Sequence, residues 1–327
     1  MKKATKWLLA GAGTATAAAA GAFAAVRAVS KKLLSIAMDR DEPEIIRNGK
    51  EKITGSPEVA NALHMSDAAA KVLESCGCAD MEPISRDEIR LVGHFYECPT
   101  AKRIVIAMHG WRSSWAKDFG VISQFFHSND CSVLSAEQRA QNQSEGEHMT
   151  FGLLERYDCL DWIHWINDHL DDSLPIYLAG VSMGATTVLM TSDLELPANV
   201  RGVVADCGFT SPHAIWKHVV ENNLHLPYSL HDAQVKKMVQ KKIHMSPQDH
   251  STVEALKECS VPVLFIHGAD DSFVPVSMTY ENYRACAAPK ELLIVPGAER
   301  GMSYMVERAK HEHAMRSFWA QCEEMMI

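Results

Sequence analysis

The sequence has no excess of positive charge. Lysine and arginine total 32 residues against 41 aspartate and glutamate residues, so the formal net charge is −9 at pH 7. Nucleic-acid binding depends on clustered basic side chains that neutralise phosphates, and here such clusters occur only beside an N-terminal segment. The charge balance therefore argues against a nucleic-acid partner. No repeat period stands out either.

The cysteines do not form the pattern of a disulfide framework. There are nine, an odd number in a long chain, at positions 76, 78, 98, 131, 159, 207, 259, 286 and 322. Secreted domains held by disulfides are shorter and have even numbers, so this set favours a reducing compartment and a folded domain that faces the cytoplasm. Cys76 and Cys78 form a close pair, but no second Cys/His pair follows at metal-ligand spacing. We therefore expect free thiols, with no metal and no cofactor.

One segment has no charged residue at all. Trp7–Val26 reads WLLAGAGTATAAAAGAFAAV, and a helix of this length spans roughly 30 Å, the thickness of a bilayer core. Basic residues lie on both sides of it, so the positive-inside rule does not set its orientation. Three interpretations stay open: an uncleaved membrane anchor, a secretory signal cleaved near Ala22–Ala25 to release a secreted protein, and a soluble alanine-rich helix. Residues 1–32 are set apart as an anchor or signal segment.

A helical lead-in is predicted over residues 33–87. Apolar residues such as Val59, Leu63 and Val72 recur at helical spacing, which is typical of an amphipathic helix packed against a domain. The main domain is then predicted over residues 88–327. Its first segment, Glu88–Cys98, alternates in part between polar and apolar residues and predicts an outer strand.

Beyond this strand, short apolar runs alternate with helical segments such as Leu153–Asn167. The runs are Arg103–Met108, Cys131–Ser135, Pro175–Ala179, Val200–Ala205, Val261–Ile266 and Glu291–Val295. Continuous hydrophobicity is typical of strands buried on both faces. The alternation predicts an α/β fold, a three-layer α/β/α sandwich around a mostly parallel sheet. Ligands bind such sheets beyond the carboxyl ends of the strands, so the chemistry is expected there.

One interval interrupts this rhythm. Residues 210–259 are polar to mixed, rich in histidine and lysine, and have no convincing buried strand. Structureless loops of this length are uncommon. We therefore predict a helical cap over the strand ends, with helices at Pro212–Asn223 and His231–Ile243. The alternative is an ordinary crossover helix with long loops.

The strongest chemical motif is Gly180-Val181-Ser182-Met183-Gly184, which fits G-x-S-x-G. A buried apolar run precedes it and a helix-compatible stretch follows it. In a sharp strand-to-helix turn the flanking glycines are needed because there is no room for Cβ atoms. The turn exposes the Ser182 hydroxyl at a helix N-terminus, where negative charge is favoured. The other interpretation is a tight turn with a bystander serine.

Two further strand ends fit the same chemistry. The run that ends at Met108 continues as His109-Gly110-Trp111-Arg112, where the backbone N–H of Trp111 would face that of Met183 and hold an oxyanion with it. His109 is expected to be a turn and packing residue. After Val263–Ile266 comes HGADDSFVP, and we choose Asp271 over Asp270 as the acid that orients a base, with Asp206 in reserve.

With these segments in place, Glu88–Trp319 resembles the α/β-hydrolase superfamily. The likeness is closest to the bacterial branch that resembles serine aminopeptidases, acyl-peptide-hydrolase-like enzymes and dienelactone hydrolases. The matching pieces are MHGW at 108–111, EQRAQNQSEG at 137–146, GVSMG at 180–184, ADCGFTSP at 205–212, HGADDSFVP at 267–275 and VPGAERGMSY at 295–304. The resemblance implies an eight-stranded sheet, attack on an acyl carbon by Ser182, and a histidine oriented by Asp271.

The chain departs from this family where the catalytic histidine belongs. The family pattern is close to P-G-A-x-H-G-x-S-Y, and the fifth position here is Arg300. A guanidinium has no acceptor atom and stays charged, so it cannot take the serine proton. Beside Asp271 it would form a bidentate ion pair. A second departure lies at 137–144, where the family pattern is D-x-R-G-H-G-x-S and this chain has EQRAQNQS. His311 or His313 could substitute for the missing base, although both lie in a predicted C-terminal helix.

Two functions follow. The first is a serine hydrolase that acts on an ester, thioester or peptide acyl group through an acyl-enzyme. The second is a catalytically impaired binding protein of the same fold, favoured by Arg300. The partner is expected to be a small-molecule or peptide acyl substrate, with membrane association possible through residues 7–26. The fold alone does not set the substrate, because many chemistries occur on one architecture.

Overall fold

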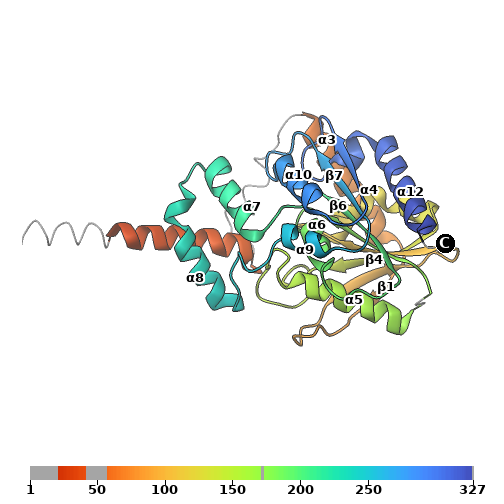
Figure 1. Ribbon diagram of the computed structural model, residues 1–327, viewed down its shortest axis with the longest axis horizontal. Helices are drawn as coiled ribbons and strands as arrows, with labels where there is room; N and C mark the ends of the chain where they lie inside the picture. Colours follow the sequence, from red (N-terminus) through yellow and green to blue (C-terminus); the bar gives the residue numbers. More distant parts are fainter. Residues whose placement is uncertain (1–20, 42–56, 171–172, 326–327) are drawn as a thin grey trace, which may run out of the picture.

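The computed structural model describes residues 21–41, 57–170 and 173–325 (Figure 1). Residues 21–38 are helical. Most of the apolar segment Trp7–Val26 lies outside the described residues. Within them, no helix combines the length and the hydrophobicity needed to cross a bilayer, so the predicted transmembrane segment finds no support there.

Eight strands form one sheet in the order β1-β2-β4-β3-β5-β6-β7-β8. They are β1 Ala79–Met81, β2 Val92–Tyr96, β3 Arg103–Met108, β4 Cys131–Glu137, β5 Ile176–Val181, β6 Val200–Asp206, β7 Val263–Gly268 and β8 Lys290–Val295. Each predicted run corresponds to one of the strands β2 to β8. The expected eight-stranded sheet is confirmed.

The prediction of a mostly parallel sheet needs correction, because the sheet is mixed. β1 pairs antiparallel with β2, and β2 pairs antiparallel with β4, whereas the pairs from β4 to β8 are parallel. The short connection from β1 to β2 contains no crossover helix, and antiparallel pairing is the arrangement that such a connection allows. β1 has only three residues, too few for a periodic signal in the sequence.

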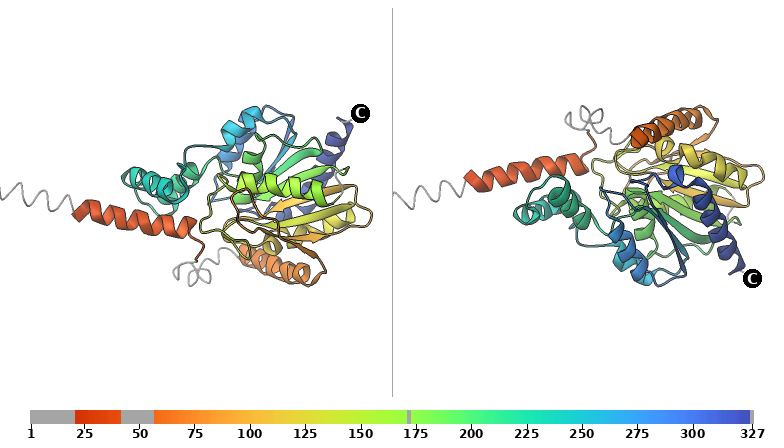
Figure 2. Two further views of the ribbon diagram at one scale, coloured as in Figure 1. Left: turned by 90° about the horizontal axis from the view of Figure 1, so that it is seen from below. Right: turned by 90° about the horizontal axis from the view of Figure 1, so that it is seen from above.

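Helices cover both faces of the sheet, as the three-layer prediction requires (Figure 2). On one face, α5 and α6 pack against strand residues such as Ile106 and Leu178. On the other, α4 and α12 pack against Val105 and Tyr177. Neighbouring strand residues thus point to opposite faces and are buried on both. The helices of these two layers include α4 Trp115–Ser128, α5 Glu155–His169, α6 Met183–Thr191, α9 Thr252–Glu258, α10 Val276–Ala285 and α12 Arg308–Glu324.

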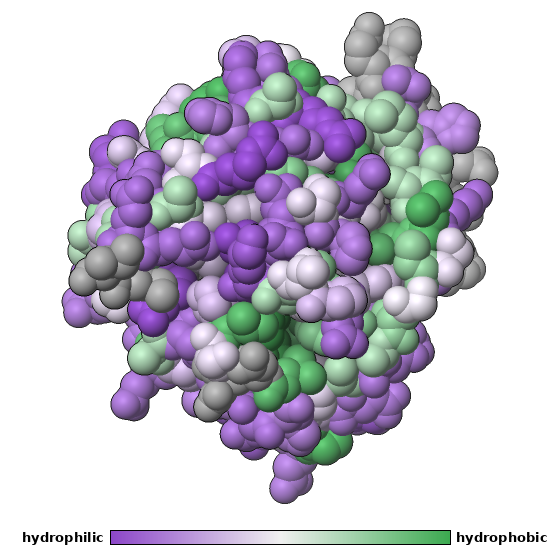
Figure 3. Space-filling view, turned by 90° about the vertical axis from the view of Figure 1, so that its right-hand side faces the viewer, coloured by the Kyte–Doolittle hydropathy of each residue, from purple (hydrophilic) through white to green (hydrophobic). Residues whose placement is uncertain are grey.

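Helices also fill the interval between β6 and β7 where a cap is predicted. They are α7 Pro212–His218, the π-helical turn η2 Val219–Asn223, the 3-10 turn η3 Tyr228–Leu230 and α8 Asp232–Ile243. Ser211 caps α7 by accepting a hydrogen bond from the Ala214 amide. These helices lie beside the helix of residues 21–38, at the end of the molecule away from the C-terminus (Figure 1). The opposite end has a largely hydrophilic surface with small hydrophobic patches (Figure 3).

The predicted lead-in of residues 33–87 divides into parts with different neighbours. α3 Pro57–Ser75 packs on α4, where Ala70 and Leu73 contact Trp115 and Ala116. A Cβ at Gly120 of α4 would lie only 2.9 Å from the Ala69 backbone, so the two helices are in close contact. The helix of residues 21–38 instead joins the cap helices.

Candidate active site

Ser182 lies at the sharp turn between β5 and α6. Its φ of 55° and ψ of −114° are rare for a residue with a side chain, and such strain persists only where the surroundings impose it. A Cβ on Gly180 would lie 2.3 Å from the Gly184 backbone, and a Cβ on Gly184 would lie 1.9 Å from the Met108 carbonyl oxygen. Both glycines of the motif are therefore sterically required.

The turn after β3 lies directly against Ser182. A Cβ on Gly110 would be 3.4 Å from the Ser182 Cβ. Asp118 holds this turn, because its carboxylate accepts hydrogen bonds from the Gly110 amide and the Ser113 hydroxyl, both at 2.6 Å. Within the part of the chain that the structure describes, the backbone N–H groups of Trp111 and Met183 donate no hydrogen bond. These two donors are free to bind an acceptor atom from outside the protein.

Asp271 follows β7 and is buried. Its Oδ1 accepts hydrogen bonds from the amides of Phe273 and Val274, both at 2.8 Å. Its Oδ2 is buried too, but has no hydrogen-bond partner among the described residues. The nearest cationic candidate, His267 Nε2, is 3.5 Å away and lies 2.9 Å from the Val274 carbonyl oxygen. A carboxylate is thus held by two backbone amides, and among the described residues its second oxygen accepts no hydrogen bond.

Asp206, the reserve candidate, is the last residue of β6 and contacts the Ser182 turn. Its carbonyl oxygen accepts the Ser182 amide at 2.8 Å, and its carboxylate accepts the Ser303 hydroxyl at 3.3 Å. Burial raises the pKa of the Asp206 carboxyl to about 6. We expect this residue to position the turn rather than to contact a ligand.

Arg300 does not form the ion pair with Asp271 that its position suggested, and that expectation was wrong. Its exposed guanidinium lies over the Phe273 ring, 4.1 Å from the ring centre. Stacking of this kind holds the cation by its flat face and leaves the N–H edge free for other acceptors. The next residue, Gly301, has a φ of 68°, and a Cβ there would lie 3.4 Å from Val181 Cγ1. The Arg300 loop therefore passes close to the Ser182 turn.

Neither candidate substitute histidine bonds to Ser182. His311 is buried in α12 with its ring edge-on to Tyr304, and burial lowers its pKa to about 4. His313 is exposed on the same helix and lines a surface groove beside β8. Across residues 21–41, 57–170 and 173–325, no imidazole hydrogen-bonds to the Ser182 hydroxyl.

His109 is fully buried, and both of its ring nitrogens have hydrogen-bond partners. Its Nδ1 lies 2.8 Å from the Gly110 carbonyl oxygen, and its Nε2 accepts the Gln138 amide at 3.2 Å. Burial lowers the pKa of this imidazole. This environment suits the turn and packing role expected for it.

An apolar cluster covers the Ser182 turn. It includes Met183 at the start of α6, Phe209 after β6, Trp216 of α7, and Leu34 and Met38 of the N-terminal helix. Its members come from segments far apart in the sequence. Met183, which follows Ser182, is thus fully buried among residues of the cap and the N-terminal helix.

Sequence reasoning missed the contribution of the N-terminal helix to this region. The Trp111 indole donates to the Ala37 carbonyl oxygen at 2.8 Å, and the Arg112 guanidinium donates to the carbonyl oxygens of Ile36 at 2.9 Å and Asp39 at 2.6 Å. A cation at a helix C-terminus is favoured by the helix dipole. The sequence gives no local signal for these contacts, because the partners lie more than 70 residues apart.

Comparisons with known proteins agree with this architecture. The family model described as the alpha/beta hydrolase fold matches residues 103–253. The uncharacterized protein YqkD of Bacillus subtilis (strain 168) is 26% identical over 190 residues, which are 57% of this chain and 61% of YqkD. The match therefore spans less than two thirds of that relative.

Solved structures have the same fold at low sequence identity. An esterase of Pyrococcus furiosus has a TM-score of 0.62 and 21% identity, over 76% of this chain and 92% of that chain. Est1E of Butyrivibrio proteoclasticus, solved with bound ferulic acid, has a TM-score of 0.59 and 17% identity, over 75% of this chain and 99% of that chain.

Proposed function

We propose that this chain, which has the α/β-hydrolase fold and whose similarities support the α/β-hydrolase superfamily, is a serine hydrolase that acts on ester, thioester or peptide acyl groups. The observation that carries the proposal is the backbone of Ser182. A non-glycine residue at φ 55°, between two glycines that tolerate no Cβ, is a costly arrangement that fixes one hydroxyl in place, although only 7% of Ser182 is exposed.

The proposed reaction begins with attack of Ser182 Oγ on the acyl carbon. The carbonyl electron pair moves to its oxygen, and the amides of Trp111 and Met183 donate to that oxyanion. Collapse of the intermediate leaves the acyl group on Ser182 and expels the alcohol, thiol or amine, which takes from solvent a proton equivalent to the one that the serine hydroxyl gave up to solvent. Water then releases the acid.

The serine proton has no imidazole to receive it in this arrangement. Removal of the general base costs on the order of 10⁶ in rate in a serine protease, so we expect slow turnover. Asp271 Oδ2 is buried and has no hydrogen-bond partner among the described residues, and the Arg300 guanidinium lies over Phe273 instead. This supports the view that the fold retains a position for a base beside Asp271, which Arg300 does not fill.

A second candidate function is the binding of an anionic ligand without hydrolysis. Its support is the guanidinium of Arg300, which lies over Phe273 with its donors available beside the Ser182 turn. A carboxylate or phosphate could accept two of these N–H groups while its neighbouring atoms approach the Trp111 and Met183 amides.

A fluorophosphonate probe and a p-nitrophenyl ester assay separate the two. Under the first proposal the wild-type chain is labelled and turns over the ester, and Ser182→Ala abolishes both. Absence of labelling together with absence of Ser182-dependent turnover would refute it. Arg300→His tests the second candidate, which requires a large gain of activity; equal turnover in the wild type and this variant would rule it out.

A further inference from the structure

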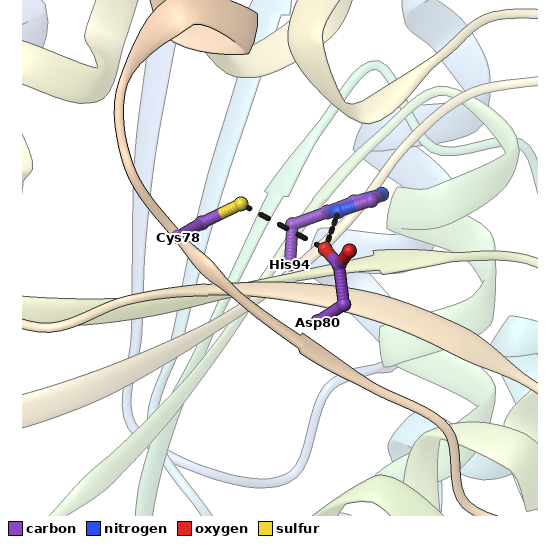
Figure 4. Close-up of side chains that lie close together, drawn as sticks. All are labelled: Cys78, Asp80 and His94. Carbon is purple, nitrogen blue, oxygen red and sulfur yellow. Dashed lines mark hydrogen bonds and ion pairs between the residues drawn. The ribbon is translucent and has the colours of Figure 1, made fainter.

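Three different metal-ligating side chains converge at the antiparallel edge of the sheet (Figure 4). The Sγ of Cys78, a carboxylate oxygen of Asp80 and Nδ1 of His94 all lie within 4.8 Å of one another. Asp80 on β1 is directly opposite His94 on β2 in the strand register. Cys78 lies just before β1, two residues ahead of Asp80, and its thiol reaches the same pair of side chains.

A buried carboxylate fixes the orientation of the His94 ring. His94 Nε2 lies 2.9 Å from Oε1 of Glu137, and Glu137 is itself held by the Gln143 amide. The His94 ring also packs on Trp115, with ring centres 4.3 Å apart. A carboxylate that accepts one ring N–H while the other ring nitrogen faces a metal is the usual support of a metal-bound histidine.

The other ring nitrogen faces an acceptor. His94 Nδ1 lies 2.9 Å from Asp80 Oδ1. A neutral imidazole has one N–H, and here Nε2–H donates to Glu137. The lone pair of Nδ1 and the Asp80 oxygen then face each other. A cation between them resolves this conflict, either as a second proton or as a metal ion.

The thiol of Cys78 favours the metal ion. It lies 3.8 Å from the same Asp80 Oδ1. In a tetrahedral zinc site, nitrogen and oxygen ligands are about 3.3 Å apart and sulfur and oxygen ligands about 3.6 Å apart, from the usual bond lengths. These two separations are within about half an ångström of those values, and Cys78 Sγ lies within 4.8 Å of the imidazole nitrogen. Cys78 and Asp80 are exposed, so their side chains can make that adjustment.

We propose that Cys78, Asp80 and His94 bind a divalent ion of the zinc class, with water at the fourth position. Sulfur, nitrogen and one carboxylate select zinc or cobalt over magnesium and calcium. The ion links β1 to β2 and has a structural role, because β1 is four strands away from β5 in the sheet. The spacing of residues in the sequence does not point to this site, because two of its ligands become neighbours only through strand pairing.

The test is a Co²⁺ and Zn²⁺ titration of the reduced, full-length chain in competition with a chromophoric chelator. We expect one ion per chain, with the thiolate-to-cobalt charge-transfer absorption that reports sulfur ligation. Cys78→Ser should abolish that absorption, and Asp80→Asn should weaken binding at least tenfold.

Cys76→Ser is the matched control, because Cys76 is an exposed thiol of the same loop outside the cluster, and it should bind as the wild type does. Circular dichroism verifies that each variant is folded. Absence of stoichiometric binding to the wild type, or equal binding to Cys78→Ser, would overturn the proposal and leave His94 as a proton-bridged imidazole.

Discussion

At the scale of single residues, Gly184 is the most tightly constrained position of the site. A Cβ there would lie 1.9 Å from the Met108 carbonyl oxygen, a backbone atom that cannot rotate away. The sequence predicts this constraint, since G-x-S-x-G between a buried run and a helix needs the space on both sides of the serine.

We expect Gly184→Ala to lower the free energy of unfolding by about 3 kcal/mol or more, because the strand and the helix must move apart. It should also abolish any Ser182-dependent labelling. Urea denaturation measures the first effect and the fluorophosphonate probe the second. Gly77→Ala is the control, since a Cβ there meets nothing within 4 Å; an equal loss in both variants would contradict the steric explanation.

His311 is the residue for which the structure predicts a pH effect. Burial lowers its pKa from 6.5 to about 4. The unfolded chain therefore binds a proton between these values that the folded chain does not, and the contribution of His311 to stability falls as the pH decreases from about 6.5 to about 4.

The variant His311→Phe keeps a ring against Tyr304 but cannot titrate. Compared with the wild type, it should lose less stability between pH 6.5 and pH 4, by up to about 3 kcal/mol from the shift in pKa. Denaturation curves at several pH values measure the difference. Parallel pH profiles for the two proteins would show that the imidazole is not buried in its neutral form.

For Arg300, the residue type at the position could be read from the sequence, but the contacts of its side chain could not. An arginine at the position where the resembled family has a histidine was visible in the sequence, but the contact of its guanidinium with Phe273 was not, because the direction of a long side chain depends on its neighbours in space. Histidine-rich stretches likewise gave no sign of which rings are buried. His311 and His313 are two residues apart on one helix, and only the first is buried.

At the scale of elements, continuous apolar runs located strands well. β3 has the predicted bounds Arg103–Met108, and α8 begins and ends within one residue of the predicted helix. β1 was not predicted, because a strand of three residues is too short to show a periodic pattern of apolar residues. The division of the N-terminal lead-in into two parts was not predicted either, because their packing partners are set by tertiary structure.

The link between the N-terminal helix and the β3 turn can be tested by Trp111→Phe. This variant removes the indole N–H that donates to the Ala37 carbonyl oxygen but retains the backbone amide and most of the ring. Loss of one hydrogen bond of about 1 kcal/mol should speed local opening, and hence amide hydrogen exchange, of residues 21–38 by on the order of fivefold.

Exchange in α4 and α5 should stay unchanged in that variant. Trp165→Phe, on the face of the sheet covered by α5, is the matched control and should leave residues 21–38 as they are in the wild type. Unaltered exchange in Trp111→Phe would mean that the indole hydrogen bond does not contribute to holding the helix.

At the scale of the whole molecule, strand–helix alternation predicts the three layers and the position of the site at the carboxyl ends of the strands. It does not predict strand order. The mixed sheet and the meeting of Cys78, Asp80 and His94 both depend on the antiparallel placement of β1 and β2, which no periodic pattern encodes.

The three-residue length of β1 has a consequence for how these molecules behave when crowded. Every open sheet ends in unpaired amides and carbonyls that a second chain can extend, and long, flat, apolar edges are the most vulnerable. Here β1 covers β2 and ends after Met81, and Asp80 brings a negative charge to that border. Little backbone is left for another copy to join, so this side of the protein resists growth into fibrous aggregates.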